Sequence, residues 1–142
     1  YENKVKNLEE KIIKRLQILK DKHPKKVKRF KGAGSLFGIE FSSMIDNFES
    51  LLKNVPLDGI KNKANLISKL NVASISSELY SKHEILAHIS ESENSNFLYV
   101  APSLIASDEN VDYFFNSLDE ALKSKLDLKL LKYIISSIFN IV

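Results

Sequence analysis

The sequence contains no cysteine and no tryptophan, and only one methionine, three prolines and four glycines among its 142 residues. Without cysteine there is no disulfide framework, no thiol nucleophile and no thiolate-bound zinc or iron–sulfur centre. The same absence is typical of a reducing compartment, so we predict a cytoplasmic protein. The chain begins at Tyr1 and not at methionine, which we interpret as processing or as origin from a longer protein.

Long apolar runs are also missing. The N-terminal stretch is charged and lacks the apolar core of a signal peptide. The most apolar segment, 126–142, is shorter than the ~20 apolar residues that a membrane-spanning helix needs. It also carries Asp127, Lys129 and Lys132. We therefore predict no membrane partner, and we interpret 126–142 as an apolar C-terminal helical extension.

Positive charge is concentrated in one place, although the formal net charge is only +3. Seven of the twelve residues in segment 20–31 are lysine or arginine. Such a run is typical either of a solvated loop and strand edge or of an electrostatic surface for nucleic acid. No recognised nucleic-acid motif and no set of stacking aromatics accompanies it, so we favour the first interpretation. A non-catalytic interaction or nucleic-acid-binding module using 20–31 remains the alternative.

Length and a hydrophobic content of 44% predict a single domain over residues 1–142. Apolar residues at spacings of three and four predict a helix over 2–22, which His23-Pro24 ends. Two short strands, 27–31 and 35–41, flank the turn Gly32-Ala33-Gly34 and predict a β-hairpin.

The rest of the chain is predicted to contain further helices and two further strands. Helices are predicted over 44–53, 60–70 and 72–83, and strands over 85–89 and 97–101. Ser107 predicts the cap of a last helix that begins with Asp108 and Glu109. The order of elements predicts an α+β domain, with a small, mainly antiparallel sheet packed against helices.

Groups suited to catalysis are few. The three histidines, His23, His83 and His88, have no metal-ligand spacing. The sequence contains no nucleophile elbow, no phosphate loop and no complete dinucleotide-binding glycine pattern. From the residues alone we predict no catalytic residue, no metal site and no bound cofactor in this chain.

Two segments resemble the C-terminal small domain of class III pyridoxal-phosphate-dependent aminotransferases. The first, VKRFKGAGSLFGIEF (27–41), is similar to the family pattern of a basic residue, Gly-x-Gly, a short apolar stretch and Gly-Ile-Glu. The second, LYVAPSLIASDENVDYFFNSLDEAL (98–122), resembles the closing strand, proline turn and acidic-capped helix of that family. Both occur in the family's order, about sixty residues apart.

The resemblance implies the C-terminal domain of a fold-type I enzyme that exchanges amino groups between an amine or amino acid and an aldehyde or keto acid. The Schiff-base lysine and the aspartate that pairs with the pyridine nitrogen would lie upstream of this chain. Pyridoxal phosphate is therefore implied in a full-length parent and not on this chain alone, which would not be competent by itself. The implied partner is the cofactor-binding domain of that parent, which would be a homodimer; nucleic acid is not expected.

The resemblance also implies a substrate-facing wall, formed by Tyr99, Pro102 and Ser103 with His88 on the neighbouring strand. Many members carry an arginine in the strand before the proline, where it clamps a substrate carboxylate. Tyr99 occupies that position here, and a phenol cannot replace a guanidinium. We therefore expect a parent that acts on an amine or aldehyde without that carboxylate, or that binds the carboxylate elsewhere. Tyr99 as an ordinary half-buried strand tyrosine is the other interpretation.

Overall fold

The computed structural model describes residues 2–42, 63–91 and 96–124, which form three helices and one four-stranded sheet. In chain order the elements are α1 (Glu2–Lys22), β1 (Val27–Ala33), β2 (Leu36–Phe41), α3 (Lys63–His83), β3 (His88–Glu91), β4 (Asn96–Val100) and α4 (Asp108–Lys123). The sheet is antiparallel throughout, so the predicted α+β class is confirmed.

The sheet consists of two hairpins joined through their inner strands. Its order is β1-β2-β4-β3, and β1 and β3 are the edges. The inner pair is in register from Phe37 opposite Val100 to Glu40 opposite Phe97. This pairing places the two segments that carried the family resemblance side by side.

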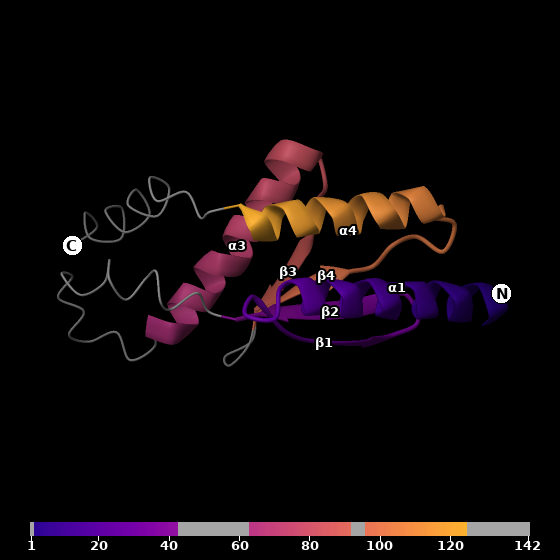
Figure 1. Cartoon of the computed structure of the whole chain (residues 1–142), viewed down its shortest axis with the longest axis horizontal. Coiled ribbons are helices and arrows are strands. Elements are labelled where there is room, and N and C mark those ends of the chain that lie inside the picture. The colour runs from indigo at the N-terminus through magenta and orange to yellow at the C-terminus, as the bar shows by residue number, and fades with distance from the viewer. Residues whose placement is uncertain (1, 43–62, 92–95, 125–142) are drawn as a thin grey trace.

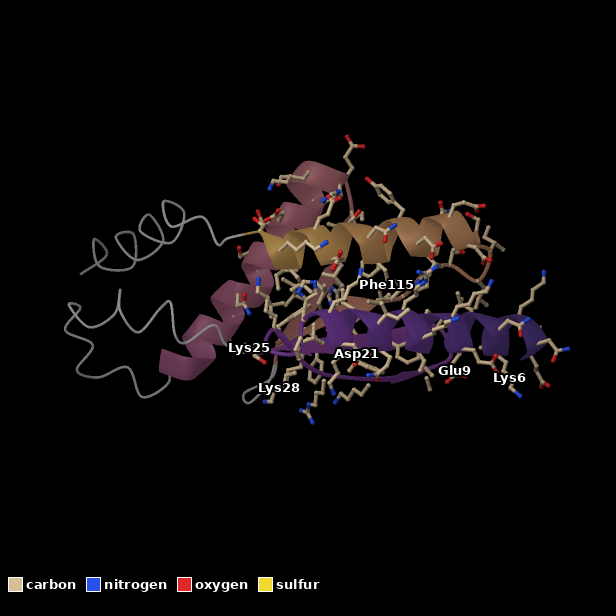
Figure 2. The ribbon with its side chains drawn as sticks, in the orientation of Figure 1. Lys6, Glu9, Asp21, Lys25, Lys28 and Phe115 are labelled. Carbon is tan, nitrogen blue, oxygen red and sulfur yellow. The ribbon has the colours of Figure 1, made fainter. Side chains whose placement is uncertain are left out.

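The helices cover one face of the sheet. Helices α1 and α4 run side by side in the same direction, and α3 crosses α4 (Figure 1). Side chains from all three helices and from the near face of the sheet form one core. Phe115 lies in this core beneath α4, whereas Lys6, Lys25 and Lys28 project outward (Figure 2).

The first and last helices form as their sequences predict. The predicted stripe of α1 is buried at Leu8, Ile12, Leu16 and Leu19. Helix α4 begins where Ser107 Oγ accepts a hydrogen bond from the backbone N–H of Asn110 at 3.3 Å. This bond satisfies one of the free donors of the first helical turn.

Two predictions in the middle of the chain are wrong. The helices predicted over 60–70 and 72–83 are one helix, α3, which passes through Asn71 without a break. Asn71 is 4% exposed, and its Nδ2 donates to the carbonyl of Ser42 at 2.9 Å. A tertiary hydrogen bond therefore satisfies the polar side chain at the position left between the two predicted helices.

The strand predicted over 85–89 begins only at His88. Glu84 ends α3 with a φ of 56°, and its N–H donates to the carbonyl of Tyr80. The N–H of Ile85 donates to the carbonyl of Leu79, so Ile85 still belongs to the cap that closes α3. The apolar residues 85–87 therefore follow the helix end and do not join the sheet. The predicted helix 44–53 and extension 126–142 lie outside the described residues. Within the described part of the chain, no helix has the length and apolar character needed to cross a membrane.

Candidate functional site

A hollow of about 490 Å³ opens between the end of β4 and the first turns of α4. Three segments line it: residues 85–87 after α3, residues 99–103 and 105–106 from β4 into the following loop, and the α4 face that carries Asn110, Val111, Phe114 and Phe115. The second and third segments are nearly continuous in sequence, because β4 leads directly into the loop before α4. Residues 85–87 come beside them because β3, which begins at His88, pairs with β4.

The loop wall of the hollow is held by local backbone bonds. Pro102 follows β4 and cannot donate to a strand ladder. The N–H of Ala106 then donates to the carbonyl of Ser103 at 2.9 Å, and the N–H of Ile105 lies 3.4 Å from Ser103 Oγ. These bonds form a tight turn that delivers the chain to the Ser107 cap.

The opposite wall is fixed through the end of α3. After Glu84 turns the chain, Ser76 Oγ donates to the carbonyl of Ala87 at 3.4 Å. The hydroxyl of Tyr113, on α4, donates to the carbonyl of His83 at 3.1 Å. Both sides of the hollow are therefore tied to α3.

The hollow is electrically neutral. Among the described residues that line it, none is aspartate, glutamate, lysine, arginine or histidine. The first turn of α4 beside it carries Asp108 and Glu109, and a hydrogen bond from Ser107 lowers the pKa of Glu109. The positive end of the α4 dipole is thus already met by carboxylates and is not available to an anionic ligand.

The predicted wall residues divide between two faces. Pro102 and Ser103 line the hollow, and Tyr99 borders it. The Tyr99 ring, however, lies over Gly38 on the sheet face away from the helices: a Cβ added to Gly38 would be 3.4 Å from Tyr99 Cε1. The His88 ring is 6.1 Å from the Tyr99 ring, and His88 is not part of the hollow.

On that outer face the charges of β1 are paired. Glu40 is 5% exposed and accepts hydrogen bonds from Lys28 Nζ at 2.9 Å and from Arg29 Nε. Burial alone would raise the pKa of Glu40, but the hydrogen bonds and positive charges of Lys28 and Arg29 hold it below its ordinary value. Phe97 beside them has Lys31 Nζ 4.6 Å from its ring centroid.

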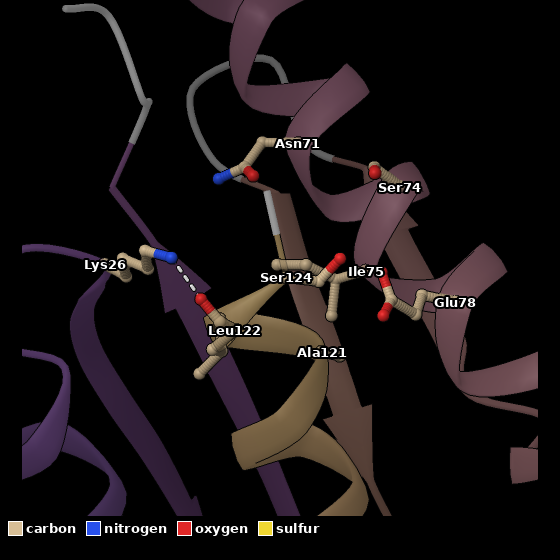
Figure 3. Close-up of a pocket in the computed structure, with 8 residues that line it drawn as sticks. All are labelled: Lys26, Asn71, Ser74, Ile75, Glu78, Ala121, Leu122 and Ser124. Carbon is tan, nitrogen blue, oxygen red and sulfur yellow. Dashed lines mark hydrogen bonds between the residues drawn. The ribbon is translucent and has the colours of Figure 1, made fainter. Parts of the chain in front are cut away.

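Other members of the basic segment 20–31 also have partners. Lys22 and His23 contact Asp119, and Lys26 Nζ donates to the carbonyl of Leu122 at the end of α4 (Figure 3). The cleft around Lys26 holds only about 20 Å³, roughly the room for one water. In the part of the chain that the structure describes, no three His, Asp or Glu side chains gather as metal ligands. These pairings do not favour the nucleic-acid alternative.

Sequence reasoning missed the residues 85–87, Asn110 and Phe114 as parts of a site. Residues 85–87 were predicted as part of a strand, and Asn110 and Phe114 fall in the predicted last helix, where no role was assigned to them. The signal that could have found them is Pro102 closely followed by a capped helix, since a short loop there leaves the end of the sheet uncovered.

The sequence matches no model of a known protein family and no curated protein, but its fold is similar to part of several solved transaminases. An aminotransferase from Bacillus anthracis aligns with a TM-score of 0.57 and 20% identity over 86% of this chain and 24% of its own. A transaminase from the marine bacterium Virgibacillus aligns with a TM-score of 0.61 and 17% identity, over 92% of this chain and 25% of its own. An S-selective transaminase from Arthrobacter sp. with alanine bound aligns with a TM-score of 0.58 and 22% identity, over 84% of this chain and 24% of its own. At these identities the likeness shows the fold alone, and the chain spans about a quarter of the length of these proteins.

Proposed function

We propose that this chain is the C-terminal small domain of a class III pyridoxal-phosphate-dependent aminotransferase. The observation that supports it most is the pairing of β2 with β4. The two segments with the family's sequence pattern are adjacent in this pairing, with Gly38 opposite Tyr99 and Ile39 opposite Leu98. Their adjacency gives the resemblance a structural basis that neither short motif has alone.

The cofactor itself does not fit the residues of this chain. A pyridoxal phosphate site needs a lysine amine for the aldehyde and several donors for the phosphate. The described lining of the hollow has no lysine, arginine or histidine, and α4 begins with two carboxylates. We therefore place the cofactor on another domain of the parent and derive no chemical step through it here.

The role of this chain in the parent would be to shape the entrance for substrate. Pro102 and Ser103 would form one side of that entrance, and the Tyr99 and His88 rings would form a second surface on the outer face of the sheet. The three helices that the structure describes lie on the opposite face, and the outer face is the surface we propose for contact with the cofactor-binding domain of the parent. Catalysis would need both domains, so the isolated chain is expected to transfer no amino group.

The test is to sequence the reading frame upstream of the Tyr1 codon and to express its whole product. We expect a cofactor-binding domain with a Schiff-base lysine, and transfer of an amino group from an amine to a keto acid. The 142-residue chain mixed with pyridoxal phosphate serves as the control and should be inactive. A complete reading frame without such a domain, or a whole product without transfer activity, would contradict the proposal.

A further inference from the structure

We infer that the groove between α1 and α4 is a binding site for a small organic anion that consists of one carboxylate group and a short apolar body. The groove measures about 400 Å³, and sites for small ligands typically measure about 300–1,000 Å³. Among the described residues it shares only Val111 with the hollow at the end of β4. The inference therefore goes beyond the proposed function and does not depend on it.

The two walls of the groove carry opposite charges. Lys11 precedes Lys14 by three positions and Arg15 by four, so the three cations project from one side of α1. The facing wall, on α4, carries Asp108 and Asp112. Lys11 pairs with Asp108, and Arg15 Nη2 pairs with Asp112. These two contacts join the walls about one helical turn apart.

The third cation gives the groove an excess of positive charge. Lys14 has no ion-pair partner among the residues that the structure describes. A guanidinium also has several N–H donors, so Arg15 can donate to a ligand while its Nη2 stays on Asp112. A monoanion near Lys14 and Arg15 would balance the excess, whereas a dianion would be repelled more strongly by Asp108 and Asp112.

The groove also offers apolar surface next to these cations. Ile18 follows Lys14 by four positions, lines the groove and is 40% exposed. Val111 contributes a second apolar side chain from α4. An apolar body attached to the carboxylate would cover Ile18 and remove its surface from water, which favours binding. A bare inorganic anion would gain no such contact.

The lining differs in this respect from the hollow at the end of β4, which is neutral. A carboxylate entering that hollow would lose water without gaining a cationic partner, which is costly in free energy. The α1–α4 groove supplies that partner at its exposed edge. An organic anion should therefore bind in the groove and not in the hollow.

The experiment follows the amide resonances of the 142-residue chain during separate titrations with hexanoate, hexanamide and acetate at neutral pH. Hexanamide has the same apolar body without the charge, and acetate has the charge without the body. We expect hexanoate to bind with a Kd of about 1–10 mM, as its few atoms allow, and the other two probes at least about tenfold more weakly. The shifted amides should include those of Lys14, Arg15, Ile18 and Asp112.

Matched variants on α1 and α4 test the location. Lys14→Gln should weaken hexanoate binding about fivefold, whereas Lys6→Gln, which alters an outward-pointing lysine of the same helix, should not (Figure 2). Ile18→Ser should weaken it similarly, with Ile13→Ser as control, because Ile13 is 41% exposed but does not line the groove. Asp112→Asn removes a repelling charge and frees Arg15, so it should strengthen binding about threefold.

Amides far from the groove report in the same spectra that each variant is folded. Equal binding of hexanamide and hexanoate, or hexanoate shifts at Ala87 and Ser103 in place of the groove, would overturn the inference. Equal losses in Lys14→Gln and Lys6→Gln, or weaker binding by Asp112→Asn, would do the same. None of these outcomes bears on amino transfer by the parent.

Discussion

Nε2 of His23 lies 2.7 Å from Oδ1 of Asp119, and this contact joins the end of α1 to the last turns of α4 across 96 positions of sequence. Both side chains are largely buried, at 10% and 13% exposure. Asp119 also accepts from Lys123 at 2.6 Å and lies 3.7 Å from Lys22. One carboxylate thus holds together groups from two helices and the residue before Pro24.

The first prediction concerns the pH dependence of this contact. Burial alone would raise the pKa of Asp119, but hydrogen bonds from Lys123 and His23 hold it below its ordinary value of 3.8. A lowered folded-state pKa adds stability that is complete above the unfolded-state pKa and is lost as pH falls through the folded-state value. Asp119→Asn should therefore cost about 1–2 kcal/mol of unfolding free energy at pH 7 and flatten the loss of stability below pH ~4.

Urea unfolding measured between pH 2.5 and 7 checks this prediction. Asp112→Asn is the matched control, because Asp112 is on the same helix and pairs with Arg15 at the surface, where both side chains are about 40% exposed. Such a pair contributes only about 0–1 kcal/mol. The same acid-side slope in Asp119→Asn and in the unchanged chain would contradict the assignment.

A second prediction concerns Glu40 on the outer sheet face. Glu40→Gln removes the charge that Lys28 and Arg29 share and should reduce the unfolding free energy by about 1–3 kcal/mol. Glu10→Gln, on the exposed side of α1, should change it by less than about 0.5 kcal/mol. Chemical denaturation at pH 7 distinguishes them, and equal effects would show that the Glu40 cluster adds no stability.

A third prediction follows from the left-handed backbone at Glu84. Glycine has no Cβ penalty at a φ of 56°, although it loses more backbone entropy on folding. Glu84→Gly should therefore stabilise the chain by about 0.5–1 kcal/mol. Ser81→Gly, three residues earlier and inside α3, should destabilise it by about 0.5 kcal/mol. Thermal unfolding should show a higher unfolding temperature for Glu84→Gly and a lower one for Ser81→Gly. A loss of stability in Glu84→Gly would count against a strained cap.

A fourth prediction explains two glycines of the Gly-x-Gly pattern by different causes. A Cβ on Gly32 would collide with the carbonyl of Leu36 and lie 2.6 Å from Cα of Phe37, both backbone atoms. Gly34 has open space, with only Val5 within 3.5 Å, but its φ is +62°. Gly32→Ala should cost about 2 kcal/mol or more, because the hairpin must shift.

Gly34→Asn should cost less than Gly34→Ala, since asparagine tolerates the left-handed region. Gly32→Asn gains no such relief. Urea unfolding of the four variants distinguishes the two causes: lack of space for a Cβ at Gly32 and the positive φ at Gly34. A milder effect of asparagine at both positions would contradict the assigned causes.

Local signals in the sequence predicted much of this fold. The apolar spacing of α1, the glycines of the β1–β2 hairpin and the Ser107 cap of α4 each depend on residues within a few positions of one another. The predicted turn Gly32-Ala33-Gly34 is nevertheless wrong in extent, because Gly32 and Ala33 pair with Phe37 and Leu36 as part of β1 and the turn begins at Gly34. The other errors came where a distant group decided the outcome. Asn71 sits inside a helix because Ser42 accepts its amide, and residues 85–87 leave the sheet because a non-glycine residue adopts a left-handed turn.

The candidate site was predictable only in part, for a similar reason. Pro102 and Ser103 are close in sequence and remain together in the hollow. His88 and Tyr99 pair across two strands and share a face, but strand alternation puts their rings on the face away from α4. The neutrality of the hollow arises from three separate segments, so no single stretch of sequence displays it.

The sheet order has a consequence for how quickly the chain reaches its native state. Each hairpin joins strands that are close in sequence, whereas the β2–β4 pairing brings together residues such as Phe37 and Val100 across more than sixty positions. Closing a long loop costs chain entropy before the contact repays it, so non-local pairing slows folding. We expect the two hairpins to form early and the β2–β4 pairing to be the slow step. The residues that carry the family resemblance would then be brought together last, as the native state is completed.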